Sequence, residues 1–311
     1  MVRQLNGLNR VWSQPAGGGP GQVMDDAASR ALFGLLPLPV AVVTSPVPVP
    51  AVAGQLWKPA SAGAPTFHLG TADWPAVLKN LTREGSSGGM ATKIPVPSGH
   101  IDWEYGNAPE RQYYVDPTTE PGYGNPFSIG PDGEVIITAN KAKTPNAGQD
   151  FLSGFLCTAG NGGVMFAQKY GYFTSRLKWQ LVAGMWPAFW FLSTDNNFQY
   201  VFEPDVMENW QAMVGQPHCG IANSGNGGVF YMVPNPADQH VFGLDYRADT
   251  TTFYLDGVSV FSQATPANCL DKHIFPIWNI AVGRAGTWAG QPPPAANATM
   301  GLHIYEFAAF A

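Results

Sequence analysis

The feature that most restricts the fold of this chain is a series of short segments rich in β-branched and aromatic residues, separated by turn residues. The chain carries 36 glycines and 28 prolines in 311 residues, many of them between these segments. Strands at this spacing are typical of a β-sandwich or β-barrel. Strand–helix alternation is missing, which disfavours a parallel α/β sheet. The predicted strands are 135–139, 151–158, 172–181, 188–192, 199–208, 241–246, 252–261, 277–282 and 302–310.

Composition narrows the function. Hydrophobic residues make up 45% of the chain, which is ample for the core of a large β-domain, whereas charged residues make up only 12%. That charged share is low for a freely soluble monomer, so we expect partners to cover part of the surface. The net charge of −6 gives no basis for nucleic-acid binding, which normally requires a basic patch.

The cysteines and histidines do not predict a metal or redox site. Cys157, Cys219 and Cys269 are far apart in the sequence and form no C-x-x-C motif. We interpret them as small buried hydrophobic residues, with a Cys157–Cys219 bridge as the alternative. None of the six histidines has a metal-like spacing, which disfavours a zinc site.

The first 65 residues differ from the rest, so we predict an N-terminal arm over 1–65 and a β-domain over 66–311. The run 31–57 has no charged residue, but its five prolines rule out a membrane-spanning helix. We expect short helices over 25–34 and 73–81. The arm cannot bury its own valines, so we expect it to pack on a neighbouring subunit, in a homo-oligomer or a larger particle. A disordered tail is the alternative.

Three acidic residues, Glu203, Asp205 and Glu208, lie within six positions of a strand-like run. Alternation along a strand places Glu203 and Asp205 on one face and Glu208 on the other. A β-bulge near Val206–Met207 would return Glu208 to the face of the other two. Two such carboxylates are what a retaining glycosidase uses. A solvated acidic strand end is the alternative interpretation.

The segments around these acids give the chain a family resemblance. In order they are Glu110–Tyr114, Glu134–Ala139, Tyr170–Lys178, Gly184–Leu192, Phe253–Gly257, Phe275–Gly283 and Trp288–Gly290. With the E-x-D-x-x-E centre, this set resembles glycoside hydrolase family 16, the laminarinase-like β-glucanases and their relatives, over about residues 101–310. The resemblance implies an all-β jelly-roll sandwich of two curved antiparallel sheets.

The resemblance also implies roles for the three acids. Glu203 would be the nucleophile, Asp205 would tune it, and Glu208 would be the acid/base. Glu203 must be ionised to attack the anomeric carbon, whereas Glu208 must hold a proton for the leaving oxygen. We expect Asp205 to share a proton or a hydrogen bond with Glu203, because crowding raises the pKa of at least one of the acids.

Aromatic and polar residues would then hold the sugar. Trp186 and Trp190 share one strand face and offer stacking platforms, with core packing as the alternative. Trp210 follows the acids and would floor the site. The resemblance adds Arg176 as a partner for sugar hydroxyls or a carboxylate, Glu110, Gln112 and Asn107 on the donor side, and His218 on the leaving-group side. Trp103 and Trp288 are weaker candidates.

Two departures from the family pattern bear on activity and on metal binding. Pro204 removes a ladder donor from the strand that carries the acids. His303 replaces an Asp that commonly contributes to a structural calcium site, so we expect no cofactor and doubt the calcium.

We predict a retaining endo-β-glycanase acting on a β-1,3-glucan-like polysaccharide outside the cell. The sequence shows no signal peptide, which with the arm suggests a virion-associated protein. The alternative function is a non-catalytic carbohydrate-binding or structural virion protein, in a tail or on a capsid surface, built on the same scaffold.

Overall fold

The computed structural model describes residues 63–81, 90, 92, 110–145, 148–160, 163–194, 202–210, 215–222, 227–286 and 294–311. It also describes the backbone of β1 (Val2–Gln4), β2 (Val11–Ser13) and β3 (Gln22–Met24), which pair antiparallel. The rest of the predicted arm up to residue 62, with its helix over 25–34, lies outside the described residues. The arm and the boundary at residue 65 therefore stay predictions.

Two sheets form the body of the described structure, and the smaller one carries the acidic residues. Among the described residues it has seven strands, in the order β12-β21-β14-β15-β16-β17, with β9 paired to β21. The strands are β9 (Phe155–Cys157), β12 (Gln168–Lys169), β14 (Met185–Ser193), β15 (Pro204–Glu208), β16 (His218–Ile221), β17 (Val229–Phe230) and β21 (His273–Val282).

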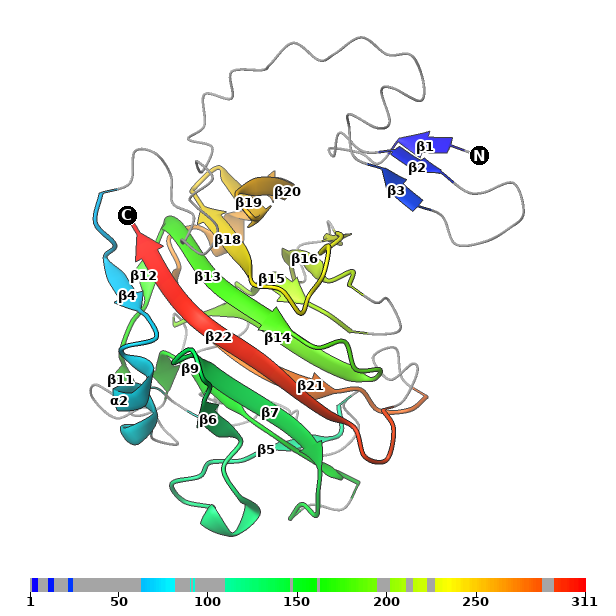
Figure 1. Cartoon of the computed structure of the whole chain (residues 1–311). Coiled ribbons are helices and arrows are strands. Elements are labelled where there is room, and N and C mark those ends of the chain that lie inside the picture. The colour runs from blue at the N-terminus through cyan, green and yellow to red at the C-terminus, as the bar shows by residue number, and fades with distance from the viewer. Residues whose placement is uncertain are drawn as a thin grey trace.

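The larger sheet has ten strands in the described part of the chain, in the order β20-β19-β18-β13-β22-β7-β8-β5, with β4 on β22 and β6 on β7. In Figure 1, β22 runs between β13 and β7. The strands are β4 (Phe67–Leu69), β5 (Gln112–Tyr114), β6 (Phe127–Ile129), β7 (Val135–Lys141), β8 (Phe151–Ser153), β13 (Gly171–Trp179), β18 (His240–Tyr246), β19 (Thr250–Leu255), β20 (Val258–Ala264) and β22 (Thr299–Phe310).

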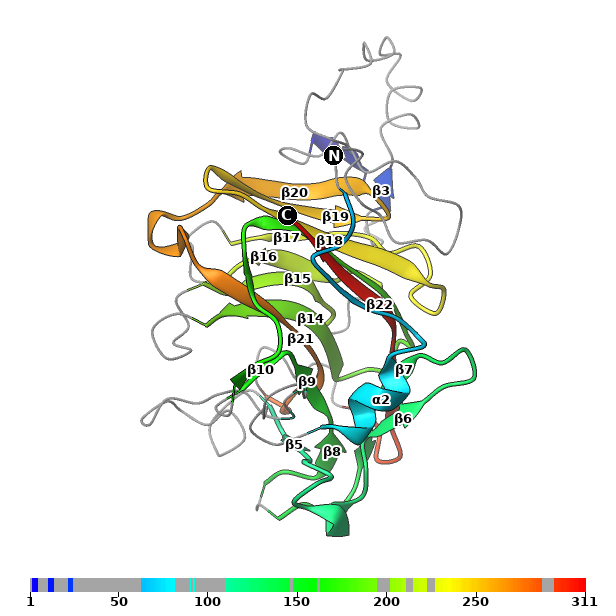
Figure 2. The ribbon, with the colours of Figure 1, turned by 90° about the vertical axis from the view of Figure 1, so that its left-hand side faces the viewer.

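The predicted all-β jelly-roll sandwich is confirmed. Figure 2 shows β14, β15 and β16 side by side in one layer and β18, β19 and β20 in another. The prediction of antiparallel pairing holds with one exception, because β5 and β8 run parallel. The smaller elements are the β10 (Ala159–Gly160) and β11 (Gly163–Val164) pair, the helix α2 (Trp74–Lys79), and the 3-10 turns η1 (Pro121–Tyr123) and η2 (Ala267–Cys269).

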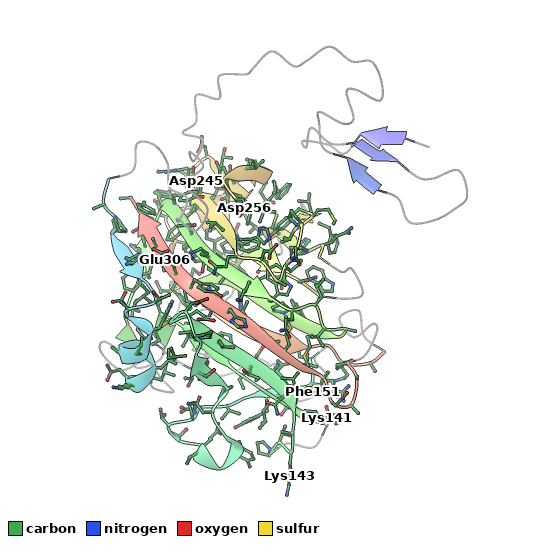
Figure 3. All side chains as sticks on the ribbon, in the orientation of Figure 1. Lys141, Lys143, Phe151, Asp245, Asp256 and Glu306 are labelled. Atoms are coloured by element: carbon green, nitrogen blue, oxygen red, sulfur yellow. The ribbon has the colours of Figure 1, made fainter. Side chains whose placement is uncertain are left out.

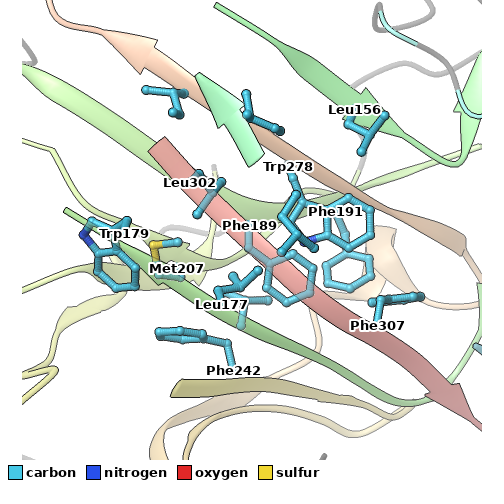
Figure 4. Close-up of a cluster of buried hydrophobic side chains, with 14 of the residues drawn as sticks. Leu156, Leu177, Trp179, Phe189, Phe191, Met207, Phe242, Trp278, Leu302 and Phe307 are labelled. Atoms are coloured by element: carbon cyan, nitrogen blue, oxygen red, sulfur yellow. The ribbon is translucent and has the colours of Figure 1, made fainter. Parts of the chain in front are cut away.

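The core lies between the two sheets and is rich in aromatic residues. Phe189 of β14 stacks on Trp278 of β21 with ring centroids 5.5 Å apart, and Trp278 meets Phe307 of β22 edge-on at 5.3 Å. Figure 4 shows these side chains with Leu177 and Phe242 of the larger sheet. Burying each such side chain contributes roughly 1.5–3 kcal/mol, so this cluster holds the sheets together.

Both faces of β14 are buried, so side chains cover this strand on each side of the sheet. Phe189 and Phe191 point into the core between the sheets. Ala188, Trp190 and Leu192 alternate with them and pack in a second cluster on the opposite side. We call that opposite side, which faces away from the larger sheet, the site face.

The structure corrects two predicted strands. The single strand over 252–261 is wrong, because Asp256 and Gly257 form a two-residue hairpin turn between β19 and β20. Both turn residues have positive φ, 48° and 75°, as a primed turn requires. The strand over 151–158 is broken at Gly154, where a Cβ would lie 2.8 Å from atoms of Ile137 and Phe127. The predicted helix over 73–81 is confirmed as α2 over Trp74–Lys79.

All three cysteines of the chain are free and buried, as the sequence predicts, so the alternative Cys157–Cys219 bridge is wrong. In the part of the chain that the structure describes, no helix combines the length and the hydrophobicity needed to cross a membrane.

Candidate active site

A bulge in β15 brings the three acids onto one face. On the neighbouring strand β14, Phe189 pairs with Met207 and the next residue, Trp190, pairs with Asp205, so Val206 is an extra residue. Val206 and Met207 are consecutive, yet both are buried in the core between the sheets. Because both point inward, Glu208 emerges on the same side as Asp205. The bulge predicted near Val206–Met207 is confirmed.

Three hydrogen bonds from other parts of the fold hold the bulge and the residue that follows β15. The hydroxyl of Tyr231 donates to the carbonyl oxygen of Val206 at 2.8 Å. Just after the strand, the backbone N–H of Asn209 donates to the carbonyl of Pro187, and its side-chain oxygen accepts from the indole N–H of Trp179, both at 3.0 Å. None of these three contacts could be predicted from the sequence, because a hydrogen bond across the fold leaves no local sequence pattern.

Pro204 is compatible with this geometry because of its place at the start of the strand. It is the first residue of β15 and pairs with Ile221 of β16. The first position of a strand tolerates proline. The bulge therefore lies beyond Pro204 and does not need to accommodate it.

The acids lie close enough to shift one another's pKa values. Burial, followed by the charges of Glu208 and Glu110, raises the pKa of Glu203 to about 8. Burial also raises the pKa of Asp205, followed by the charges of Glu208 and Glu203 and by a hydrogen bond to Glu208. The site therefore retains a proton near neutral pH.

The hydrogen-bond partner of Asp205 differs from the sequence prediction. We expected Asp205 to pair with Glu203, but its hydrogen bond goes to Glu208. The bulge explains the difference, since it turns Glu208 to the face of Asp205. Asp205 is thus placed to exchange a proton with Glu208.

His218 lies beside Glu208, as predicted. The two residues are directly opposite each other on β16 and β15, and His218 Nδ1 is 3.7 Å from Glu208 Oε2. His218 Nε2 bonds to the carbonyl of Gly227 at 3.0 Å, so this nitrogen carries a proton and Nδ1 faces the carboxyl group. Burial lowers the pKa of His218, but the contacts with Glu208 and Gly227 outweigh burial and raise it.

Gly228 makes room for the imidazole of His218. Its φ is +63°, and a Cβ at this position would lie 2.4 Å from His218 Nε2 and 2.3 Å from the carbonyl oxygen of Cys219. A side chain here would push the ring away from Gly227 and from Glu208. Gly228 was not among the predicted site residues.

Glu110 also belongs to the site, as predicted. It is buried, forms a β-bridge with Gly283 after β21, and raises the pKa of Glu203 through its charge. Gln112 Nε2 donates to Glu110 Oε2, and Gln112 Oε1 accepts from the backbone N–H of Val282 at 2.7 Å. Gln112 therefore fixes Glu110 to the edge of β21.

Two predicted sugar platforms, Trp186 and Trp190, are on the site face but are almost fully buried. Trp186 and Trp190 lie on the site face of β14, and only 7% and 6% of each is exposed. The indole N–H of Trp190 donates to Asn279 at 2.7 Å, and its ring meets Phe155 edge-on. Trp190 is therefore packed in place and is not an open platform, which supports the core-packing alternative for this residue.

Trp210 is the most accessible of these indoles. It is half-buried, with its ring 5.8 Å from that of Trp186 and 5.0 Å from that of His218. It thus connects the buried Trp186 to the side of the acids occupied by His218. This position agrees with the predicted floor of the site.

Arg176 lies away from the acids, and of its two predicted roles it has the second, pairing with a carboxylate, which is that of Glu306. It lies on β13 of the larger sheet, where it pairs with Glu306 at 3.2 Å and covers the ring of Tyr305. Glu306 is labelled on β22 in Figure 3. Arg176 alternates with the core residue Leu177 and points away from the core, toward the face opposite the acids. The remaining predicted residues, Asn107, Trp103 and Trp288, lie outside the described residues.

His303 pairs with Glu134 on the larger sheet, with Nδ1 3.0 Å from the carboxylate. Burial raises the pKa of Glu134, but its hydrogen bonds from His303 and the backbone outweigh burial and lower it. Within the described residues, no group of three or more His, Cys, Asp or Glu side chains is arranged to hold a metal ion.

Comparisons with known proteins show what this chain is similar to. Residues 133–305 match the family model "Glycosyl hydrolases family 16". Two curated proteins of Rhizobium meliloti (strain 1021) are similar, the endo-1,3-1,4-beta-glycanases EglC and ExsH. Each is 32% identical, over 60% and 57% of this chain. The chain spans less than half of their length, 43% and 39%.

A solved structure has the same fold. The catalytic domain of an endo-1,3-beta-glucanase (laminarinase) from Thermotoga petrophila RKU-1 aligns with a TM-score of 0.62 at 22% identity, covering 80% of this chain and 97% of that domain. The virion association considered from the sequence finds no support among these relatives.

Proposed function

Because this chain belongs to glycosyl hydrolases family 16, we propose that it is a retaining endo-β-glycanase that cleaves 1,3- or mixed 1,3-1,4-linked β-glucans. The observation that carries the proposal is the bulge in β15, which gathers Glu203, Asp205 and Glu208 on one face. A strand without the bulge would turn Glu208 away from the other two.

The proposed reaction has two displacements. The carboxylate of Glu203 attacks the anomeric carbon, and Glu208 gives its proton to the departing glycosidic oxygen, which leaves a covalent glycosyl ester on Glu203. Glu208, now ionised, then takes a proton from water. The resulting nucleophile attacks the same carbon and frees Glu203, so the product keeps the configuration of the substrate.

Asp205 is the residue that passes a proton to Glu208 in this cycle. The raised pKa values of Glu203 and Asp205 mean that this group of acids retains a proton near neutral pH. Catalysis requires an ionised Glu203 and a protonated Glu208. The hydrogen bond between Asp205 and Glu208 is the path by which a proton held on Asp205 reaches Glu208.

The substrate class rests on the relatives and on the chemistry of the site face. The two Rhizobium meliloti proteins are named for cleavage of 1,3-1,4-β-linked glycans, and indole rings such as Trp210 bind the apolar faces of sugars. A marine galactan is the competing substrate. The extracellular site of action and assembly through the arm remain proposals that rest on the sequence.

A polysaccharide panel tests the proposal. Purified protein is incubated with a β-1,3-glucan, a mixed-linkage β-glucan and agarose, and new reducing ends are measured. We expect release from the first or the second and a product series that shows internal cleavage. New reducing ends from agarose alone would mean that the substrate is a galactan and not a β-glucan. No new reducing ends from any of the three polysaccharides would contradict the proposed enzyme activity.

A further inference from the structure

Phe230 is an aromatic side chain that the described core does not bury. It lies on β17, the outermost strand of the seven-stranded sheet in the described structure, and 40% of it is exposed. By contrast, Cys219 on the paired strand β16 is fully buried, and the next residue in the chain, Tyr231, is almost fully buried. An exposed phenyl ring at a sheet edge offers an apolar surface to a partner.

The sheet register places Phe230 in line with the candidate acid/base residue. Phe230 pairs with His218 on β16, and His218 pairs with Glu208 on β15. Directly opposite residues point to the same face, so all three lie on the site face. Two strand spacings separate Phe230 from Glu208, which corresponds to about 10 Å. When a glycosidic bond lies at Glu208, the Phe230 ring is therefore farther away than the sugar unit that adjoins this bond.

Aromatic contacts make this line continuous. The ring of Phe230 is 5.3 Å from that of His218 and 5.2 Å from that of Trp210. Trp210 in turn meets Trp186 at 5.8 Å. Exposure increases along this series, from the buried Trp186 through the half-buried Trp210 to the exposed Phe230.

We propose that Phe230 and Trp210 form a sugar-binding platform that extends from the acids to the β17 edge of the sheet. Its occupant is the same β-glucan chain, at a sugar beyond the one next to the cleaved bond. A sugar presents a flat apolar face with hydroxyl groups around its rim, which suits a phenyl ring bordered by an indole. The proposal rests on the proposed function, because the glycan must pass through the row of Glu208 and His218.

Charge supports a neutral glycan as the occupant. The platform carries aromatic rings and one imidazole, and among the described residues paired along its row, Glu208 is the acidic one. Continuity with the acids distinguishes this surface from other exposed apolar side chains such as Val258 and Val164, whose strands β20 and β11 are not part of the seven-stranded sheet.

Binding measurements on an inactive background test the platform. Glu203→Gln prevents cleavage, and isothermal titration calorimetry measures the Kd of β-1,3- and mixed-linkage oligosaccharides of increasing length. We expect Phe230→Ala to weaken binding of the longer oligosaccharides about tenfold, with a much smaller effect on the shortest one. Phe230→Tyr keeps the ring and should restore most of the affinity.

Tyr123→Ala is the matched control, because Tyr123 is an aromatic residue with 36% exposure on η1, outside the seven-stranded sheet. It should leave every Kd unchanged, and circular dichroism should show that all variants are folded. A uniform loss at all lengths, or no loss in Phe230→Ala, would overturn the platform.

The assay of the wild-type protein separates the two proposals. If the wild type cleaves β-glucan and Phe230→Ala binds every length normally, only the platform is wrong. If the wild type binds but cleaves nothing, and Phe230→Ala loses affinity for long chains, the platform stands and the catalytic role is wrong. If the wild type neither binds nor cleaves either glucan, both proposals are wrong.

Discussion

The hydroxyl group of Tyr231 donates a hydrogen bond to the carbonyl oxygen of Val206, the extra residue of the β15 bulge, at 2.8 Å. Both residues are buried, so this carbonyl lies where an unpaired acceptor would be costly. The contact links the conformation that exposes Glu208 to a side chain on a different segment.

Tyr231→Phe should therefore lower both stability and activity. Losing the bond should reduce the free energy of unfolding by about 1–2 kcal/mol, because the buried carbonyl of Val206 loses its donor. The less firmly held bulge should also reduce kcat on β-glucan. Urea denaturation and steady-state kinetics measure the two effects, and Tyr123→Phe on the exposed η1 serves as the control. Unchanged values of both would show that the bulge does not depend on Tyr231.

Gly228→Ala should disturb His218 without altering the acids directly. The new Cβ would lie 2.4 Å from His218 Nε2, so the ring must move away from Gly227 and Glu208. Gly227→Ala is a close control, because its φ is +69° and a Cβ there would meet no atom within 4 Å. Both variants should lose stability from the positive φ, and Gly228→Ala should lose more because its Cβ would also lie 2.3 Å from the carbonyl oxygen of Cys219. We expect only Gly228→Ala to lower kcat several-fold and shift its pH profile. Equal kinetics in the two variants would exclude a role for the position of His218.

The stability of the protein should depend on pH through Glu203. Its folded-state pKa of about 8 lies above the ordinary value of 4.5, so the folded state binds more protons than the unfolded state between these values. Stability from this group is fully present below pH 4.5 and is lost as the pH rises toward 8. Glu203→Gln removes the ionisation, so its Tm should exceed that of the wild type by more at pH 8 than at pH 5. A constant difference in Tm would contradict the raised pKa.

The predicted arm should be needed for association and dispensable for the fold. The ten-stranded sheet includes β4, which begins at Phe67 and pairs with β22. A chain that starts at Ala64 therefore keeps every strand of the seven-stranded and ten-stranded sheets. Residues 31–57 are uncharged and apolar and gain stability only by packing against another surface. We expect the truncated protein to be a folded monomer and the full chain to associate, as measured by size-exclusion chromatography with light scattering. Monomers in both cases would contradict assembly through the arm.

The sequence predicts much of the fold because hydrophobic alternation and turn residues are local signals. The strands 135–139 and 241–246 follow from such patterns. The bulge follows from the parity of Glu203, Asp205 and Glu208 once the three acids are expected to share one face. The hairpin at Asp256–Gly257 was not predicted, although an Asp-Gly pair is a strong turn signal. The apolar residues on both sides of the pair were interpreted as one continuous strand.

The site was predicted less completely, because parity within a strand does not reveal which sheet the strand joins. Arg176 lies on β13 of the larger sheet, and no local pattern distinguishes that sheet from the one that carries β15. Burial of Trp190 depends on Phe155 and Asn279, which come from other strands. Tyr231 and Gly228 act through contacts across the sheet and therefore have no local signature.

The central claim is that Glu203 is the nucleophile and Glu208 the acid/base, and rescue by azide tests it most directly. Glu203→Gly should lose several orders of magnitude in rate, and azide should restore cleavage by a single displacement that gives a glycosyl azide of inverted configuration. Glu208→Gly keeps the nucleophile, so azide should attack the glycosyl ester and give an azide of retained configuration from a substrate with a good leaving group. NMR of the products distinguishes the two anomers. The opposite pairing of variants and anomers would exchange the two roles, and near wild-type rates in both variants without azide would place the catalytic site elsewhere.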